Sequence, residues 1–285
     1  MSQIELELAP DTVSRRPAEG NTVKRRRRLG KRFGKVFPSS ASLTVFVAAL
    51  ALVLGTWFLL VRFSHVSRLI LPTPGEVAQA FGHGVFRGEW LVDIATTLEE
   101  TVIGFRVGGL FAVTIGALLA YLAALRGGLY PLILAFQTFP KIAVAPLLLA
   151  WLGYGLAPKV IIAAMLAFFP VFSNTLAGFL AVDAALVDLF RSMRASAWQE
   201  LRLLRAPNAM AFILPSFDVA LVLALLGAIA AELAGASAGL GNVIQQRTFL
   251  GDTPAVYAVL LLLALLGLAM KGLMGLLTTR LRRRA

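Results

Sequence analysis

Long apolar stretches recur along this chain, and short polar segments separate them. Several of them reach or exceed the roughly 20 apolar residues with which an α-helix crosses a bilayer. Their positions predict six membrane spans, at about residues 42–62, 93–123, 129–152, 158–181, 209–233 and 254–278. The pattern therefore predicts an all-α, polytopic membrane protein with about six transmembrane helices.

The distribution of polar residues divides the chain into two regions. Residues 1–40 are polar and basic and contain Pro, Gly and Ser. Such a segment cannot bury enough apolar surface to fold, so we expect a mostly disordered tail there. We expect residues 41–285 to form one transmembrane domain, whose main loop is the polar segment at residues 183–207.

Prolines interrupt two of the predicted spans. Pro140 and Pro146 lie in the third span, and Pro170 lies in the middle of the fourth. A proline removes a backbone donor and kinks a helix, but neighbouring helices can satisfy the freed groups inside a membrane. We therefore retain both segments as spans and expect them to be bent.

Composition supports the membrane assignment and narrows the chemistry. The chain is 58% hydrophobic and 15% charged, whereas soluble domains usually carry about 25% charged residues. Cysteine is absent, which excludes disulfides and thiolate metal sites. The sequence also lacks a phosphate-binding G-x-x-x-x-G-K-[ST] motif and an H-E-x-x-H pair. We therefore expect no catalysis and no bound cofactor or metal in this chain.

The net charge of +12 lies mainly beside the apolar spans. Ten Lys and Arg residues fall in the first 35 positions and four in the last six. Few aromatic residues are interleaved with them, so we expect contact with anionic membrane lipids and no nucleic-acid binding. Basic residues favour the cytoplasmic side, which predicts that both termini and residues 183–207 are cytoplasmic.

The segment 183–207 reads DAALVDLFRSMRASAWQELRLLRAP. Its apolar residues recur at spacings of three and four and predict one helical face, formed by Leu186, Leu189, Phe190, Met193, Ala197, Leu201 and Leu204. Arginines and acids occupy the other faces. Such a helix can dock on a partner protein, or it can lie on the membrane with its arginines among anionic headgroups.

Polar residues within the spans are costly in lipid and are candidates for a solute pathway. Lys141, Ser173, Asn174 and Glu232 are such residues. Each also has a structural interpretation. Lys141 could snorkel or pair within the bundle, Glu232 could serve packing or gating, and the other two could satisfy backbone groups freed by Pro170. We expect Arg106 to pair with Glu99 or Glu100, and the candidate partners of Asp218 are Arg205 and Lys141.

Residues 183–207 resemble the cytoplasmic coupling loop of permeases of ATP-binding-cassette (ABC) importers. That loop has the pattern E-A-A, three residues, G, nine residues, I-x-L-P, and the matching positions here are Asp188-Leu189-Phe190, Arg194, Leu204, Ala206 and Pro207. Arg194 stands in place of the glycine. Several other segments are similar to permeases of nitrate, sulfonate and taurine importers: LPTPGEV (71–77), TLEETVIGF (97–105), FPKIAVAPLLLAWLGYGLAPKV (139–160), FFPVFSNTLAGF (168–179) and ELAGASAGLGNVI (232–244).

The resemblance, which covers roughly residues 70–280, implies a type I importer in a bacterial inner membrane, with a small solute that is anionic, such as nitrate, a sulfonate or taurine, or heteroaromatic. Its expected partners are two ABC ATPase subunits that bind ATP and Mg, a second permease copy forming a homodimer, and an extracytoplasmic solute-binding protein. The residues expected to dock on the ATPase are Asp188, Leu189, Phe190, Arg191, Arg194, Ala195, Trp198, Leu201 and Pro207. An ion-coupled secondary transporter is the alternative, although the sequence shows no convincing inverted repeat.

Overall fold

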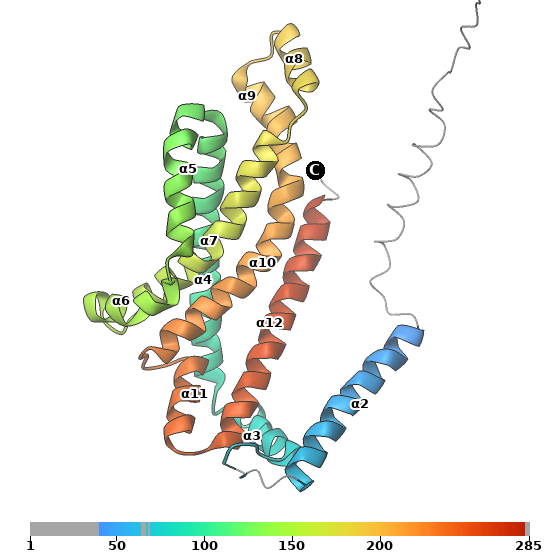
Figure 1. Ribbon diagram of the computed structural model, residues 1–285, viewed down its shortest axis with the longest axis vertical. Coiled ribbons are helices and arrows are strands. Elements are labelled where there is room, and N and C mark those ends of the chain that lie inside the picture. The colour runs from blue at the N-terminus through green and yellow to red at the C-terminus, as the bar shows by residue number, and fades with distance from the viewer. Residues whose placement is uncertain (1–39, 64–66, 68, 283–285) are drawn as a thin grey trace, which may run out of the picture. The chain divides into compact units, whose positions relative to one another are not determined.

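The computed structural model describes residues 40–63, 67 and 69–282, so the predicted disordered tail lies almost wholly outside the described residues. The chain divides into two compact units, Met1–Trp57 and Phe58–Ala285. The described elements are helices, in the order α2 (Ser40–Phe63), α3 (Pro74–Phe86), α4 (Leu91–Tyr121), α5 (Ala123–Thr138), η1 (Lys141–Val144), α6 (Ala145–Leu152), α7 (Leu156–Leu180), α8 (Ala184–Ser192), α9 (Ala197–Glu200), η2 (Leu201–Arg205), α10 (Ala206–Leu233), α11 (Leu240–Phe249) and α12 (Thr253–Arg282) (Figure 1).

The predicted spans correspond to these helices. Among the described residues, five helices are long and apolar enough to cross a membrane, and a bent pair formed by residues 123–138 and 141–152 makes a sixth candidate. The two parts of this pair meet at an angle of 78°. Phe139 is extended (φ −67°, ψ 134°), as expected for a residue that precedes a proline. Pro140 therefore explains the break, whereas α7 continues as one helix through Pro170.

Three helices, α4, α7 and α10, pack around the largest group of buried apolar side chains. This core contains Ala112, Leu119, Ala163, Ala167, Val171, Phe172, Leu176, Ala220, Ala224 and Ala228. Small residues let the backbones approach closely: a Cβ on Gly108 would lie 2.9 Å from Cα of Ala164, and one on Gly227 would lie 2.8 Å from Cα of Ala163. Close approach through small residues is the usual basis of helix packing in membranes.

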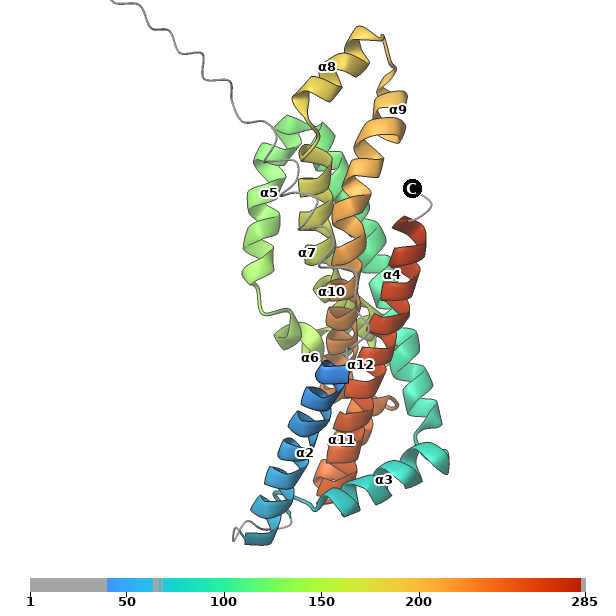
Figure 2. The ribbon, with the colours of Figure 1, turned by 90° about the vertical axis from the view of Figure 1, so that its right-hand side faces the viewer.

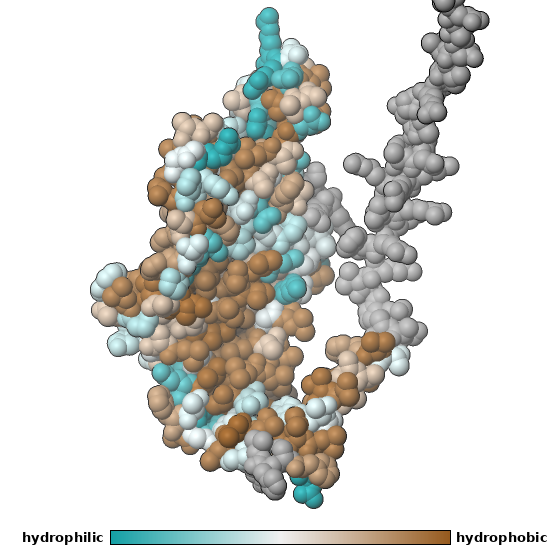
Figure 3. Space-filling view, in the orientation of Figure 1, coloured by the Kyte–Doolittle hydropathy of each residue, from teal (hydrophilic) through white to brown (hydrophobic). Residues whose placement is uncertain are grey.

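The two ends of the Phe58–Ala285 unit carry different short helices. At one end, α8 and α9 project beyond the long helices, and the last turn of α12 points toward the same end (Figures 1 and 2). The opposite end carries α3 and α11. Between the ends, hydrophobic residues cover most of the visible face, and hydrophilic residues gather at the α8 end (Figure 3). This distribution matches an apolar belt between two aqueous faces.

Candidate functional site

The projecting loop is residues 183–207, and its local sequence explains its shape. Asp183 caps α8 by accepting a hydrogen bond from the Ala185 N–H at 2.9 Å. Ser196 begins α9 in a reciprocal capping box with Gln199, a device that satisfies exposed N–H groups at a helix start. The predicted single helical face over 186–204 is therefore wrong, because a turn after Ser192 separates two short helices.

The turn between these helices depends on Arg194. Among the described residues, Arg194 is the only non-glycine residue with positive φ, at 54°. The Ala195 N–H donates to the Phe190 carbonyl at 3.0 Å, and the Arg194 N–H donates to the Arg191 carbonyl at 2.9 Å. These two hydrogen bonds form a Schellman motif, in which the residue after the helix is normally glycine. Arg194 thus adopts the turn that the pattern assigns to glycine.

The loop presents apolar side chains to its surroundings. Leu189, Met193 and Trp198 are 52%, 72% and 66% exposed. Phe190, Ala195 and Leu201 are half-buried, whereas Val187 is buried against the unit. Asp188 and Arg191 lie 3.9 Å apart as an exposed pair, which contributes little stability. Exposed apolar side chains on a projecting loop are typical of a surface that binds a partner.

The base of the loop is held to the long helices by Arg205. Its Nε lies 2.6 Å from Oε1 of Glu200, and one of its terminal nitrogens donates to the Phe179 carbonyl at 3.5 Å. Its guanidinium also lies over the Tyr121 ring, 5.4 Å from the ring centroid. The loop is therefore connected directly to the ends of α4 and α7. The carboxylate partner of Arg205 is Glu200, and Lys141 bonds only to Gln137, so neither candidate partner of Asp218 pairs with it among the described residues.

A cluster of buried charged and polar residues lies at the other end of the same helices. Lys159 of α7 donates to Glu100 of α4 at 2.6 Å, and both side chains are less than 5% exposed. Lys159 also donates to the Ala238 carbonyl at 3.2 Å. The predicted pair of Arg106 with Glu99 or Glu100 is not found among the described residues, since Lys159 holds Glu100 and Arg106 is exposed without an ion pair to Glu99.

Glu232 belongs to this cluster and is fully buried. It accepts hydrogen bonds from the Thr97 hydroxyl at 2.7 Å and from the Gly241 N–H at 2.6 Å. The Leu240 N–H donates to Thr97 at 2.9 Å. These bonds join the start of α11 and the end of α10 to α4. Both carboxylate oxygens of Glu232 are thus engaged by protein groups, and its place on a solute path stays a prediction.

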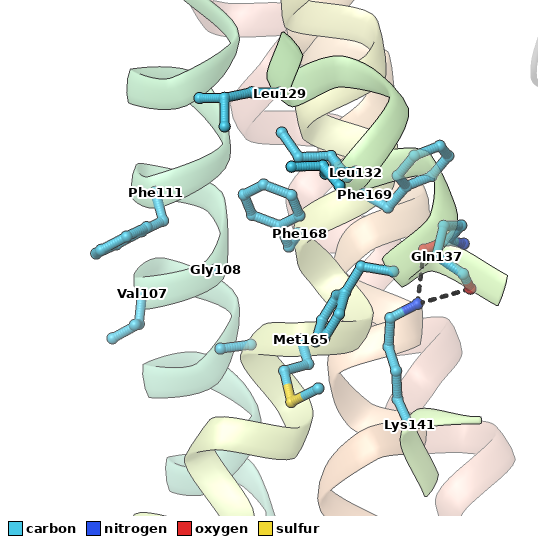
Figure 4. A pocket seen from close by; sticks show the side chains of 13 residues that line it. Val107, Gly108, Phe111, Leu129, Leu132, Gln137, Lys141, Met165, Phe168 and Phe169 are labelled. Atoms are coloured by element: carbon cyan, nitrogen blue, oxygen red, sulfur yellow. Dashed lines mark hydrogen bonds between the residues drawn. The ribbon is translucent and has the colours of Figure 1, made fainter. Parts of the chain in front are cut away.

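A cavity of about 480 Å³ lies between α4, α5 and α7. Phe111, Phe136, Phe168 and Phe169 contribute most of its aromatic surface. Lys141 reaches it from the break between α5 and α6, and its ammonium donates to the Gln137 carbonyl at 3.2 Å and to the Gln137 side-chain oxygen at 2.6 Å (Figure 4). The cavity thus combines an aromatic lining with one cation and one amide.

The other two predicted pathway residues lie elsewhere. Ser173 lines a separate hollow of about 620 Å³ together with Arg126 and Tyr130. The Asn174 side chain donates to the Pro170 carbonyl at 2.8 Å, one turn earlier in the same helix. Of the four predicted pathway residues, the structure therefore brings only Lys141 to the aromatic cavity.

Comparison with known proteins identifies the family. Residues 112–283, more than half of the chain, match the family described as binding-protein-dependent transport system inner membrane components. The chain belongs to this family. It is thus a permease of the type I ABC importer class, a non-catalytic membrane subunit, and the alternative of a secondary transporter is set aside.

Individual relatives of this permease carry different names. It is 34% identical to a riboflavin transport system permease protein of Chloroflexus aurantiacus, covering 80% of this chain and 85% of the relative. It is 33% identical to a formylaminopyrimidine transport permease protein of Halalkalibacterium halodurans, over 61% and 71% of the two chains. It is 27% identical to the taurine transport system permease protein of Escherichia coli, over 81% and 86%.

Solved structures support the fold of the permease. The chain is similar to an inward-facing MetNI methionine ABC transporter, with a TM-score of 0.56 and 20% sequence identity over 66% of this chain and 92% of the other. The predicted all-α membrane fold is confirmed. The aromatic cavity of the permease was not predicted from the sequence, because its phenylalanines lie on three helices with no shared spacing that marks them.

Proposed function

We propose that this permease is the membrane subunit of an ATP-driven importer and docks on a cytoplasmic ATPase through residues 183–207. In this proposal two copies form the path for a small solute, both termini are cytoplasmic, and an extracytoplasmic protein delivers the solute. The sequence resemblance favours an anion such as nitrate, a sulfonate or taurine. The relatives named for riboflavin and formylaminopyrimidine support the heteroaromatic class of candidates.

The observation that carries the docking proposal is the loop's combination of exposed apolar surface and firm attachment. Leu189, Met193 and Trp198 expose apolar area that a partner groove can bury. Arg205 joins the same loop to α4 and α7 through Tyr121 and the Phe179 carbonyl. A displacement of the bound partner would therefore be passed to the long helices, as coupling of ATP hydrolysis to transport requires.

Co-purification tests this docking. Leu189→Asp and Trp198→Asp place charges in the proposed interface, and we expect each to reduce recovery of the cognate ATPase at least tenfold. Phe249→Asp is the matched control, because Phe249 is 83% exposed on α11 at the opposite end of the unit. If the ATPase is recovered equally well with both loop variants, the docking surface is wrongly assigned.

Single-cysteine labelling tests the orientation, and the native chain is already free of cysteine. Ser192→Cys lies at the exposed end of α8, and Gln246→Cys is exposed on α11. In right-side-out vesicles, a membrane-impermeant maleimide should label Gln246→Cys directly and Ser192→Cys only after permeabilisation. The reverse pattern would place residues 183–207 outside the cytoplasm and refute the proposed topology.

A further inference from the structure

We infer that the aromatic cavity between α4, α5 and α7 is the intramembrane solute site, and that it takes a planar aromatic or heteroaromatic solute bearing an anionic or carbonyl oxygen. The inference rests on the proposed function, in which the permease forms the solute path. It goes further by choosing between the solute classes that the proposed function leaves open. Four observations support it: the broken span, the lack of a carboxylate beside Lys141, the aromatic lining and the volume of the cavity.

The cavity lies where one span is broken. The chain leaves α5 at Thr138, turns through Phe139 and Pro140, and re-enters helical structure at Lys141 with a bend of 78°. Irregular backbone at membrane depth is tolerated only where it is buried in protein or lines a cavity. Discontinuous helices of this kind also form the substrate sites of other membrane transporters. The break thus positions a charged, buried residue, Lys141, at the cavity.

Lys141 is only 8% exposed, yet its contacts differ from those of the other buried lysine, Lys159. Lys159 has a carboxylate, Glu100, at 2.6 Å. Within the part of the chain that the structure describes, Lys141 has no carboxylate within 4 Å, and both of its hydrogen bonds go to Gln137. An ammonium has three N–H donors, and a buried cation without a counter-charge is costly. An anionic or carbonyl oxygen of a solute would satisfy it.

The lining of the cavity favours a flat ring system. Phe168 stacks on Phe172 with an interplanar angle of 10° and a centroid distance of 5.4 Å, which fixes the orientation of its ring. Phe169 and Phe111 also contribute to the lining, and Met165 lies about one turn before Phe168 on α7 (Figure 4). Aromatic rings bind best through offset stacking or edge contacts with other rings. An inorganic anion would gain nothing from these surfaces beyond the contact with Lys141, and an aliphatic anion would gain burial of its apolar chain but no ring stacking.

The volume of the cavity also fits a planar aromatic solute. About 480 Å³ lies within the roughly 300–1,000 Å³ typical of small-molecule sites. A lipid acyl chain could enter such a space, because Phe111 and Leu132 are 63% and 65% exposed at its mouth. An acyl chain carries no acceptor for Lys141, however, so the buried ammonium favours a solute with an oxygen acceptor.

Riboflavin fluorescence provides the test, because riboflavin is planar, heteroaromatic, rich in carbonyl oxygens and quenched when it stacks on aromatic rings. The complete transporter, with its ATPases, is placed in lipid nanodiscs. Riboflavin binding is followed by fluorescence quenching, and ATP hydrolysis is measured with riboflavin, taurine or nitrate. We expect saturable quenching by the native complex and at least a tenfold higher Kd with Lys141→Met or Phe168→Leu. Lys141→Arg, which retains the cation, should keep most of the affinity.

Lys271→Met is the matched control, since Lys271 is exposed on α12 and lies outside the cavity. It should leave the Kd unchanged. If Lys141→Met leaves the quenching unchanged, riboflavin partitions into lipid and does not bind at the cavity. If taurine or nitrate stimulates ATP hydrolysis and riboflavin does not, the solute is not aromatic. Either result overturns the inference. Failure of the ATPases to assemble with the permease would refute the proposed function instead.

Discussion

Replacement of Arg194 by glycine should give a more stable turn between α8 and α9 than replacement by alanine. Arg194 has a φ of 54°, a left-handed conformation in which a Cβ crowds the following carbonyl oxygen. A non-glycine residue in this region costs on the order of 1–3 kcal/mol. The hydrogen bonds of the turn involve only the backbone of Arg194, so glycine can keep them and remove the strain.

The magnitude follows from three opposing effects. Glycine relieves about 1–2 kcal/mol of left-handed strain, but its freer unfolded backbone costs about 0.5–1 kcal/mol. The positive charge of arginine beside the C-terminus of α8 contributes about 0.3–1 kcal/mol through the helix dipole. Arg194→Ala loses the charge and keeps the strain, so it is the appropriate reference. We expect Arg194→Gly to exceed Arg194→Ala in local stability by about 1 kcal/mol.

Hydrogen exchange of the purified permease measures this difference. The Ala195 amide donates to the Phe190 carbonyl at 3.0 Å, and its exchange reports the opening of the turn. A gain of about 1 kcal/mol slows exchange roughly fivefold, since about 1.36 kcal/mol corresponds to a factor of ten. If Arg194→Gly exchanges as fast as Arg194→Ala, then backbone strain does not govern this turn and the reasoning fails.

Two further predictions concern the packing of the long helices. Lys159→Met leaves Glu100 buried without its cation and should destabilise the fold by about 3–5 kcal/mol. Thermal unfolding in detergent should show a lower midpoint that Glu100→Gln, added to Lys159→Met, partly restores. If Lys159→Met alone unfolds at the same midpoint as the native chain, the buried pair of Lys159 and Glu100 does not stabilise the fold. Gly108→Ala places a methyl group against the Ala164 backbone and should cost about 1–3 kcal/mol. Gly272→Ala, with no atom near its new methyl, should instead stabilise by up to about 1 kcal/mol, and equal midpoints for the two alanine variants would refute the packing argument.

The long helices could be predicted because their signal is local. Twenty or so consecutive apolar residues mark a span whatever surrounds it, and Pro140 indicated the break in the third span. The short helices α3 and α11 were not predicted, since neither is apolar or long enough to stand out. For α3 a signal was present: Thr73 and Glu76 form a capping box at its start, and LPTPGEV contains both residues.

The candidate site was harder to predict because its contacts are distant in the sequence. Lys159 and Glu100 are 59 positions apart, and no spacing rule connects two different spans. The position of Lys159 inside an apolar run was a signal for burial, but it did not identify Glu100 as its partner. The loop at 183–207 was recognisable from its pattern. The prediction of one continuous helical face was wrong, because the spacing of apolar residues gives no sign of the turn at Arg194.

The arrangement of contacts explains how a loop at one end could affect a cavity farther along the same helices. At one end α4, α7 and α10 are joined by Lys159, Glu100, Thr97 and Glu232, all buried. At the other end Arg205 joins the loop to α4 and α7. Helices fixed at both ends move together as one body. By contrast α5, every residue of which is described, has no buried side chain and is linked to α6 through the bend at Pro140. In the coupling that we propose, a displacement of the loop would move α4 and α7, two walls of the cavity, as a unit, and the loosely packed α5 would be the wall against which the cavity width changes.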